Sequence, residues 1–291
     1  MANSIVNRKS NEEIKKYWTP ERMRNATPIS FQPSKSLKTD SVVEPDAPPR
    51  TSPGYDPTAP KEITSEDGVS FVASATRVPD PTAYPWRTVG KLYFTVNGQD
   101  RSGSAATIYK NTILTAAHNL KLNGQWSDNF LFVPAKTGDD LPYGVWAWAQ
   151  AHVMPEWNVS ENDAYDVGIL WMQSGGIDDE PIGDSVGYLG YTVNRTVPRE
   201  WTDVGYPSNY GNARYMYKQP GMYTRSMEDG RIVGKEGDMA EGTSGGPWLI
   251  PPVELNYVNG IHSFGDDRYP DEVFSPYFRT SIGNFINEHL H

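Results

Sequence analysis

The chain has 291 residues, 37% of them hydrophobic, and carries a formal net charge of −10 at pH 7. This length suffices for one large domain or two medium ones with a buried core. The sequence contains no cysteine, which excludes disulfides, thiol nucleophiles and thiolate metal sites. No run approaches the roughly 18 apolar residues of a spanning helix, so we expect no membrane partner.

The negative charge lies in the later part of the chain. Residues 1–85 hold 11 basic and 11 acidic side chains, whereas residues 86–291 hold 15 basic and 25 acidic ones. A phosphate-binding surface requires the opposite sign, so we expect no nucleic-acid partner. No two of the five histidines stand at HExxH spacing, and we expect neither a bound metal nor another cofactor.

The chain begins with a short helical pattern. Ser10 and Glu13 form a capping box, and Ile14 and Trp18 share one helix face. A segment this small does not fold alone. Two interpretations stay open: Trp18 and Met23 dock on another part of the protein, or the segment is partly disordered.

Proline dominates the next segment. Six prolines lie between Pro45 and Pro60. Proline cannot donate to a β ladder, so we expect an extended linker without regular pairing. We therefore assign residues 1–85 to an N-terminal extension and residues 86–291 to the main domain. The extension is either a segment that is removed on maturation, together with its linker, or a permanently attached arm.

From about residue 87 the pattern changes to short apolar strands separated by Gly, Asn, Asp and Pro. Many short strands with turn residues between them favour an all-β sandwich or barrel. The last segment, residues 281–290, predicts a helix with Ile282, Phe285 and Ile286 on one face. The predicted strands cover residues 92–96, 112–115, 130–133, 145–149, 167–171, 221–225, 247–250 and 257–261.

Three local patterns carry chemistry. His118 follows an apolar strand, Asp166 opens another, and Ser244 stands between glycines. Each alone is commonly structural: a hydrogen-bonded histidine, a turn aspartate or a tight turn. Together, in the order His, Asp, Ser, they favour nucleophilic catalysis.

The residue types explain that chemistry. A serine hydroxyl needs a base to take its proton, and histidine titrates near neutrality. Aspartate holds the imidazole in the required tautomer. Glycines allow backbone N–H groups to face a developing oxyanion, and we expect those of Gly242 and Ser244 to do so.

Thr115-Ala-Ala-His118, Asp166-Val-Gly-Ile-Leu and Gly242-Thr-Ser-Gly-Gly-Pro247 resemble the signatures of chymotrypsin/trypsin-like serine endopeptidases. Within that clan the chain is similar to the bacterial branch that includes the glutamyl endopeptidases. The resemblance implies two antiparallel Greek-key β-barrels with a C-terminal helix. It places His118 and Asp166 on the first barrel and Ser244 on the second, and it implies a monomer that hydrolyses peptides or proteins through an acyl-enzyme.

The resemblance also implies secretion, although the first residues lack the apolar segment of a signal peptide. Many relatives bridge the histidine loop with a disulfide, but this chain has Gly103-Ser-Ala at that place. We therefore expect packing and hydrogen bonds to hold the loop. Thr243 stands where animal trypsins have the aspartate that pairs with a freed N-terminus, so activation by that ion pair is not expected.

Residues 260–265 and the segment before Ser244 should wall the pocket for the residue preceding the scissile bond. By resemblance His262, with Ser263 beside it, meets a substrate carboxylate and favours cleavage after Glu. Asp238 stands where trypsins bind Arg or Lys, and Met239 replaces an expected threonine. A third interpretation makes His262 a packed strand residue.

Two other functions remain open. Gly242-Thr-Ser-Gly-Gly246 also matches the nucleophile elbow of α/β-hydrolases, which predicts an esterase. That fold needs Ser, acid and His in this order and strands that alternate with helices, which this sequence does not show. A trypsin fold with a silent site would instead be a binding module.

Overall fold

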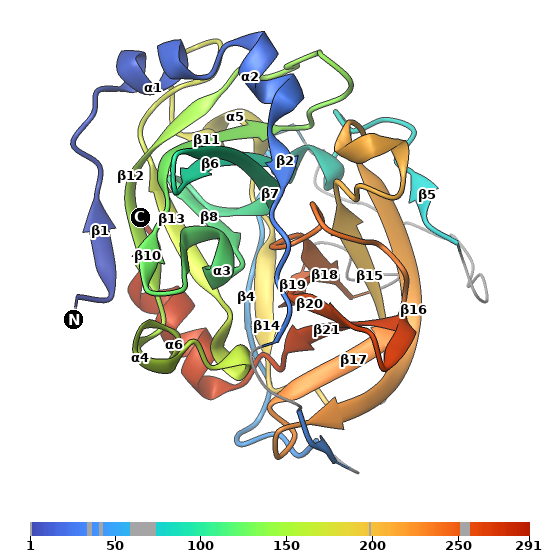
Figure 1. Ribbon diagram of the computed structural model, residues 1–291. Coiled ribbons are helices and arrows are strands. Elements are labelled where there is room, and N and C mark those ends of the chain that lie inside the picture. Colours follow the sequence, from blue (N-terminus) through green and yellow to red (C-terminus); the bar gives the residue numbers. More distant parts are fainter. Residues whose placement is uncertain (1, 34–36, 41–42, 59–73, 198, 251–256) are drawn as a thin grey trace.

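The computed structural model describes residues 2–33, 37–40, 43–58, 74–197, 199–250 and 257–291 (Figure 1). The end of the predicted linker, residues 59–60, and residues 61–73 of the extension lie outside the described residues. Two large β-sheets make up most of the molecule, and a helix follows at the C-terminal end. The prediction of an all-β fold with a C-terminal helix is confirmed.

Six antiparallel strands close into the first barrel, in the order β6-β7-β8-β13-β12-β11. Side chains two apart on a strand share a face, which puts Trp146 and Trp148 together in the barrel core. Trp148 packs edge-on against Phe130, with ring centroids 5.1 Å apart. The strands are β6 (Val89–Val96), β7 (Gln99–Tyr109), β8 (Thr112–Thr115), β11 (Asp128–Pro134), β12 (Trp146–Val153) and β13 (Gly168–Met172).

The second sheet curves around the opposite side of the molecule (Figure 1). Its pairings are antiparallel except for β14 with β19, which run parallel and depart locally from the predicted pattern. Its strands are β14 (Gly190–Val193), β15 (Glu200–Gly205), β16 (Tyr217–Met227), β17 (Ile232–Glu236), β18 (Pro247–Leu249), β19 (Tyr257–Ile261), β20 (Phe264–Asp266) and β21 (Tyr269–Pro276).

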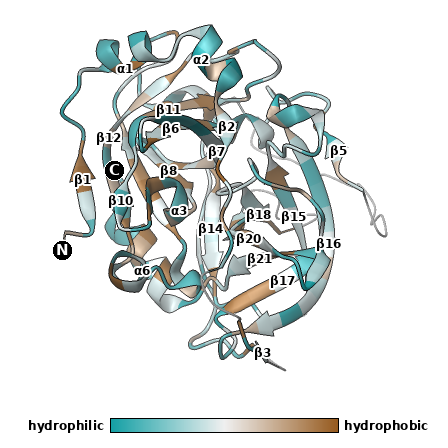
Figure 2. Cartoon of the chain, viewed as in Figure 1, coloured by the Kyte–Doolittle hydropathy of each residue, from teal (hydrophilic) through white to brown (hydrophobic). Residues whose placement is uncertain are grey.

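Short elements connect the strands, and one longer helix ends the chain. Helix α6 (Thr280–Glu288) buries Ile282, Phe285 and Ile286, as predicted. Figure 2 shows hydrophobic residues on strands such as β17 and a hydrophilic surface on the helix α1. The remaining connecting elements are η1 (Trp86–Thr88), α3 (Ala117–Leu120), β9 (Lys121–Leu122), β10 (Gln125–Trp126), α4 (Pro155–Ser160), η2 (Asp163–Tyr165), α5 (Ile182–Val186) and η3 (Gly211–Ala213).

The N-terminal extension packs on both sheets. The capping box of Ser10 and Glu13 is present, and Trp18 is 2% exposed with its indole N–H donating to the Asn129 carbonyl at 2.6 Å. Trp18 and the half-buried Met23 therefore dock on the first barrel. The elements are β1 (Ser4–Val6), α1 (Asn11–Tyr17), α2 (Pro20–Asn25), β2 (Thr27–Pro28), β3 (Thr39–Asp40), β4 (Arg50–Ser52) and β5 (Thr76–Arg77).

The prediction that the proline-rich segment builds no ladder is wrong at β4. Residues Arg50–Ser52 pair with β14 in antiparallel register. The prolines at 49 and 53 flank these three residues and do not interrupt them. The N–H groups between the prolines remain available to the ladder, so a short strand forms inside a segment that is otherwise irregular.

Candidate active site

His118 and Asp166 are brought together by two neighbouring strands of the first barrel. His118 lies on α3, directly after β8, and Asp166 directly precedes β13. The two strands pair with Thr115 opposite Gly168. The turn after one strand and the turn before the other therefore meet at the same end of the barrel.

A fully buried hydrogen-bonded pair results. Nδ1 of His118 lies 2.7 Å from Oδ2 of Asp166, and the backbone N–H of His118 donates to Oδ1 at 2.8 Å. Both side chains are 0% exposed. The carboxylate fixes the ring orientation and places the neutral tautomer's proton on Nδ1, which leaves Nε2 as the basic nitrogen.

Ser244 comes from the second sheet, in the turn before β18. Its carbonyl accepts from the Ser104 backbone N–H at 2.8 Å and from the Asn119 side-chain amide at 2.9 Å. Asn119 follows His118 directly, so these bonds tie the serine turn to the histidine loop. A Cβ on Gly103 would lie 2.8 Å from that amide nitrogen, which explains the glycine there. The expectation that hydrogen bonds hold the loop agrees with this arrangement.

Within the described part of the chain, Nε2 of His118 has no hydrogen-bond partner. The aromatic ring of Phe31, from the N-terminal extension, stacks on the His118 ring with centroids 4.6 Å apart and planes 16° apart. The Ser–His hydrogen bond is therefore not formed in this state. Such bonds commonly tighten only when substrate binds, so the arrangement remains compatible with a base beside Ser244.

Two backbone N–H groups beside Ser244 are available to a ligand. The N–H groups of Thr243, Gly245 and Gly246 donate to carbonyls of the protein. Those of Gly242 and Ser244 have no acceptor among the described residues, and they are the two predicted donors. Gly242 has φ +95, and a Cβ there would lie 2.4 Å from a backbone oxygen, so only glycine permits this turn.

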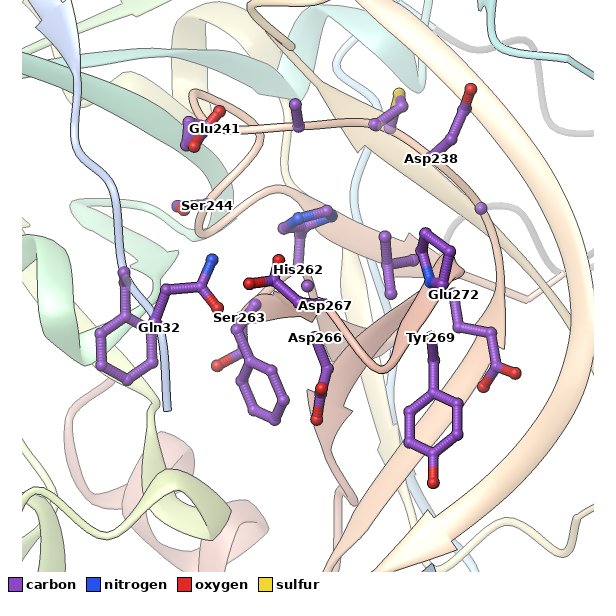
Figure 3. A pocket seen from close by; sticks show the side chains of 18 residues that line it. Gln32, Asp238, Glu241, Ser244, His262, Ser263, Asp266, Asp267, Tyr269 and Glu272 are labelled. Carbon is purple, nitrogen blue, oxygen red and sulfur yellow. The ribbon is translucent and has the colours of Figure 1, made fainter. Parts of the chain in front are cut away.

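A cavity of about 290 Å³ opens beside Ser244 (Figure 3). The predicted pocket residues Asp238, Met239, His262 and Ser263 all line it. His262 is held from behind, because its Nδ1 lies 2.7 Å from Oδ2 of Asp203. The structure thus brings the predicted pocket residues to the same cavity as the predicted nucleophile.

The carboxylate of Asp238 is engaged by neutral donors. It accepts from the Tyr210 hydroxyl at 2.6 Å and from the Gln219 amide at 2.7 Å. The hydrogen bond from Tyr210 to this carboxylate raises the pKa of Tyr210 to about 12. Figure 3 shows the Asp238 carboxylate directed away from Ser244.

Ser263 has a second contact that the sequence did not indicate. Its hydroxyl donates to Oδ2 of Asp166, the same oxygen that meets His118. Ser263 therefore lines the cavity, but its hydroxyl is hydrogen-bonded to the Asp166 carboxylate. The second sheet thus supports the His–Asp pair of the first barrel directly.

Five acidic residues of the described chain line the cavity, and two of them pair with arginines. Asp266 pairs with Arg268, and the hydrogen bond from that guanidinium lowers the pKa of Asp266. Glu272 pairs with Arg225 at 2.6 Å. No group of three His, Asp or Glu side chains among the described residues is arranged to hold a metal ion.

Three residues at the site were missed from the sequence: Phe31, Asn119 and Asp203. Phe31 stands in a short, mostly polar segment, which carries no pattern of its own. Asn119 is an ordinary polar residue by type. Asp203 had a weak signal, as a carboxylate between the apolar residues Trp201 and Val204.

Comparison with known proteins gives one curated relative, a glutamyl endopeptidase from Bacillus licheniformis. It is 28% identical over 164 residues, which cover 55% of this chain and 46% of that protein. The match thus spans less than half of the relative. No family model matches the chain.

Solved structures cover the fold more completely. Protease Anisep from Arthrobacter nicotinovorans is 27% identical, with a TM-score of 0.63 over 69% of this chain and 94% of that one. The thermostable serine protease AL20 from an extremophilic microorganism is 25% identical, with a TM-score of 0.64 over 69% and 96%. A Glu endopeptidase in complex with MPD, at 21% identity and TM-score 0.61 over 74% and 95%, supports the fold alone.

The fold and these comparisons define the class: the chain is a homologue of trypsin-like serine proteases with the two-barrel fold. Within that class it is a glutamyl-endopeptidase-like homologue, as the sequence motifs indicated. The all-β fold excludes the α/β-hydrolase alternative, because that fold needs helices on both faces of a mostly parallel sheet.

Proposed function

We propose that this protein is a serine endopeptidase that uses His118, Asp166 and Ser244 as a catalytic triad. The observation that carries the proposal is the buried His118–Asp166 pair, with Nδ1 to Oδ2 at 2.7 Å, tied by Asn119 to the backbone of Ser244. A fixed base beside a serine in a glycine turn is the arrangement that acyl transfer requires.

The chemistry proceeds in two stages. The Ser244 hydroxyl attacks the peptide carbonyl carbon while Nε2 of His118 takes its proton, and Asp166 stabilises the imidazolium. The N–H groups of Gly242 and Ser244 bind the oxyanion. His118 then protonates the leaving amine, and water releases the acyl group by the same steps in reverse order.

For the residue before the scissile bond, we propose a preference for Glu. His262 lines the cavity, and the buried carboxylate of Asp203 holds its ring in place. Both oxygens of Asp238 already accept hydrogen bonds, which makes it a weaker partner for Arg or Lys. The name of the curated relative points the same way.

We propose further that residues 86–291 form the protease domain and residues 1–85 an extension that is removed on maturation. The expected substrates are proteins or peptides, and we expect the enzyme to act as a monomer. Among the described residues, no helix is long and apolar enough to cross a membrane.

The test combines a peptide library with a fluorophosphonate probe. Because Phe31 covers the His118 ring, both the full chain and its Phe31→Ala form are assayed. We expect hydrolysis and labelling that Ser244→Ala lowers by about 10⁴–10⁶. Turnover that survives Ser244→Ala overturns the mechanism. Complete lack of hydrolysis and labelling in both forms would favour the binding-module alternative.

The same library reads the specificity. Cuts mainly after Glu support the proposal, whereas cuts after Arg or Lys that Asp238→Asn reduces would replace it with the trypsin-like alternative. The two outcomes can be told apart because the Glu preference depends on the imidazole of His262, whereas a preference for Arg or Lys depends on the carboxylate of Asp238.

A further inference from the structure

A second buried His–carboxylate pair lies behind the cavity. Asp203, on β15, is 0% exposed, and its Oδ2 lies 2.7 Å from Nδ1 of His262. The backbone of His262 is fixed as well, because its N–H donates to Gly246 and its carbonyl accepts from Gly245, both at 2.8 Å. The ring is thus held in place against the serine turn.

The hydrogen bonds around this pair leave His262 as the partner of Asp203. Oδ1 of Asp203 has no hydrogen-bond partner in the described part of the chain, and Oδ2 meets the ring of His262. The nearby Lys235 is also buried, but its ammonium donates to the carbonyls of Gln219 and Glu236 and not to Asp203.

The cavity side leaves the ring available. Nδ1 of His262 is engaged by Asp203, and Nε2 has no protein partner among the described residues. Of the acidic residues that line the cavity, Asp266 and Glu272 pair with arginines, and Asp238, Glu241 and Asp267 line it as well. An oriented imidazole nitrogen therefore faces a cavity large enough for a side chain of the size of glutamate.

We propose that Asp203 is a positioning residue for acidic substrates: it orients His262 toward a carboxylate in the cavity. The proposal rests on the proposed protease function and deepens it. Asp203 does not touch the substrate. It acts through the imidazole, so its removal should change selectivity more than turnover.

The experiment compares two peptides that differ only in Glu or Gln before the scissile bond, with Asp203→Asn in the Phe31→Ala form. We expect the Glu/Gln ratio of kcat/KM to fall about tenfold, mainly through KM for the Glu peptide. The Gln peptide should change by less than about threefold. Asp184→Asn, an exposed isosteric change on α5, is the matched control and should leave the ratio unchanged.

Three results decide the matter. Equal loss on both peptides would make Asp203 merely structural and overturn the proposal. A parent enzyme that cleaves both peptides equally well would also overturn it while the protease function stands. If neither peptide is cleaved and Ser244 does not label, the protease function itself fails.

A separate observation concerns residues 27–32, here called the strap. The strap is anchored on the first barrel, where β2 pairs with β7 and the Ile29 N–H donates to the Ser102 carbonyl at 3.1 Å. Further along the extension, β3 pairs with β16 of the second sheet. Figure 1 shows this part of the chain running between the two sheets.

Two side chains of the strap lie in the candidate active site. Phe31 stacks on His118 and also contacts the rings of Trp157 and Phe264, at 5.6 and 6.4 Å between centroids. Gln32 lines the cavity, and Figure 3 shows its amide directed toward Ser244 and Ser263. A peptide cannot reach the base while an aromatic ring covers it.

We infer that the strap is an intramolecular inhibitor that keeps substrate from His118 until it is displaced. Anchors on both sheets hold it over the cleft without a covalent bond to the site. This second proposal also rests on the protease function, but it makes a different prediction, since loss of Phe31 should raise activity.

The test uses Phe31→Ala in the full chain, with Tyr55→Ala as the control. Tyr55 is an aromatic residue of the same extension, 45% exposed and outside the cleft. We expect Phe31→Ala to raise peptide hydrolysis and probe labelling at least about tenfold, because the ring that covers His118 is removed and more of the protein can bind substrate. Tyr55→Ala should not.

Equal activity of the full chain and Phe31→Ala would overturn the inhibitory role and leave the protease proposal intact. Activation that persists in Phe31→Ala, Ser244→Ala would show that another site is being measured. Activation by Tyr55→Ala to the same extent would indicate a general loosening of the extension and also overturn the role of Phe31.

Discussion

The molecule contains two His–carboxylate pairs with the same Nδ1–Oδ2 distance, and the two carboxylates differ in their other hydrogen bonds. Each has Nδ1 and Oδ2 2.7 Å apart and a carboxylate that is fully buried. Asp166 accepts from the ring and backbone of His118 and from Ser263, whereas among the described residues the Asp203 carboxylate accepts a hydrogen bond from the ring of His262 alone. The first carboxylate is thus held by several donors and the second by one.

The proposed function gives the two pairs different roles. His118 is the proposed base for Ser244, and His262 is the proposed partner of a substrate carboxylate. The number of hydrogen bonds around each carboxylate is the difference that the variants below test.

The largest expected effect comes from Asp166→Asn. An amide at this position can hold the wrong tautomer of His118, so kcat should fall about 10⁴-fold on Glu and Gln peptides alike. Steady-state kinetics in the Phe31→Ala form measure this loss. A change in the Glu/Gln ratio comparable with that expected for Asp203→Asn would break the distinction between the two pairs.

Next comes Lys235→Met, which tests the charge beside Asp203. Burial lowers the pKa of Lys235 from 10.5 to about 8. The unfolded chain therefore holds this proton between about pH 8 and 10.5 while the folded chain releases it, and stability should rise with pH across that window. Below the window the full cost of the buried charge is present.

In Lys235→Met that rise disappears. The difference in free energy of unfolding between variant and parent should shrink by about 1–3 kcal/mol from pH 7 to pH 10. Urea unfolding at the two pH values measures it. A difference that does not depend on pH would mean that Lys235 stays protonated throughout, and the charge balance around Asp203 would need revision.

The smallest effect is expected from Ser263→Ala. It removes one of the donors to Asp166, and the loss of a hydrogen bond to a charged group should lower kcat about tenfold. The pH profile of kcat should shift with it, because the carboxylate then stabilises the imidazolium differently. Ser275→Ala, also buried on the second sheet, controls for a general loss of packing. An unchanged kcat would show that the third donor is dispensable.

Much of the fold was visible in the sequence because its signals are local. The predicted strand at residues 145–149 and the amphipathic end of the chain both match elements of the structure, β12 and α6. The motifs around His118, Asp166 and Ser244 were visible for the same reason: a strand end, a strand start and a glycine turn each leave a short pattern.

The pairing of β4 was missed because the number of prolines in the whole segment does not show that three consecutive residues between two prolines are free to pair with another strand. Asp203 and Ser263 were not assigned their contacts because each partner lies far along the chain, 59 residues away for His262 and 97 for Asp166. No periodicity links such positions.

The sequence by itself determined the class of fold and the types of residue available for chemistry, since short-range patterning sets strands, turns and caps. Tertiary structure alone decided which carboxylate supports which histidine, that the Ser263 hydroxyl turns to Asp166, and that Phe31 covers His118. These outcomes depend on packing between segments remote in the chain, where a buried polar group bonds to whichever partner the fold places beside it.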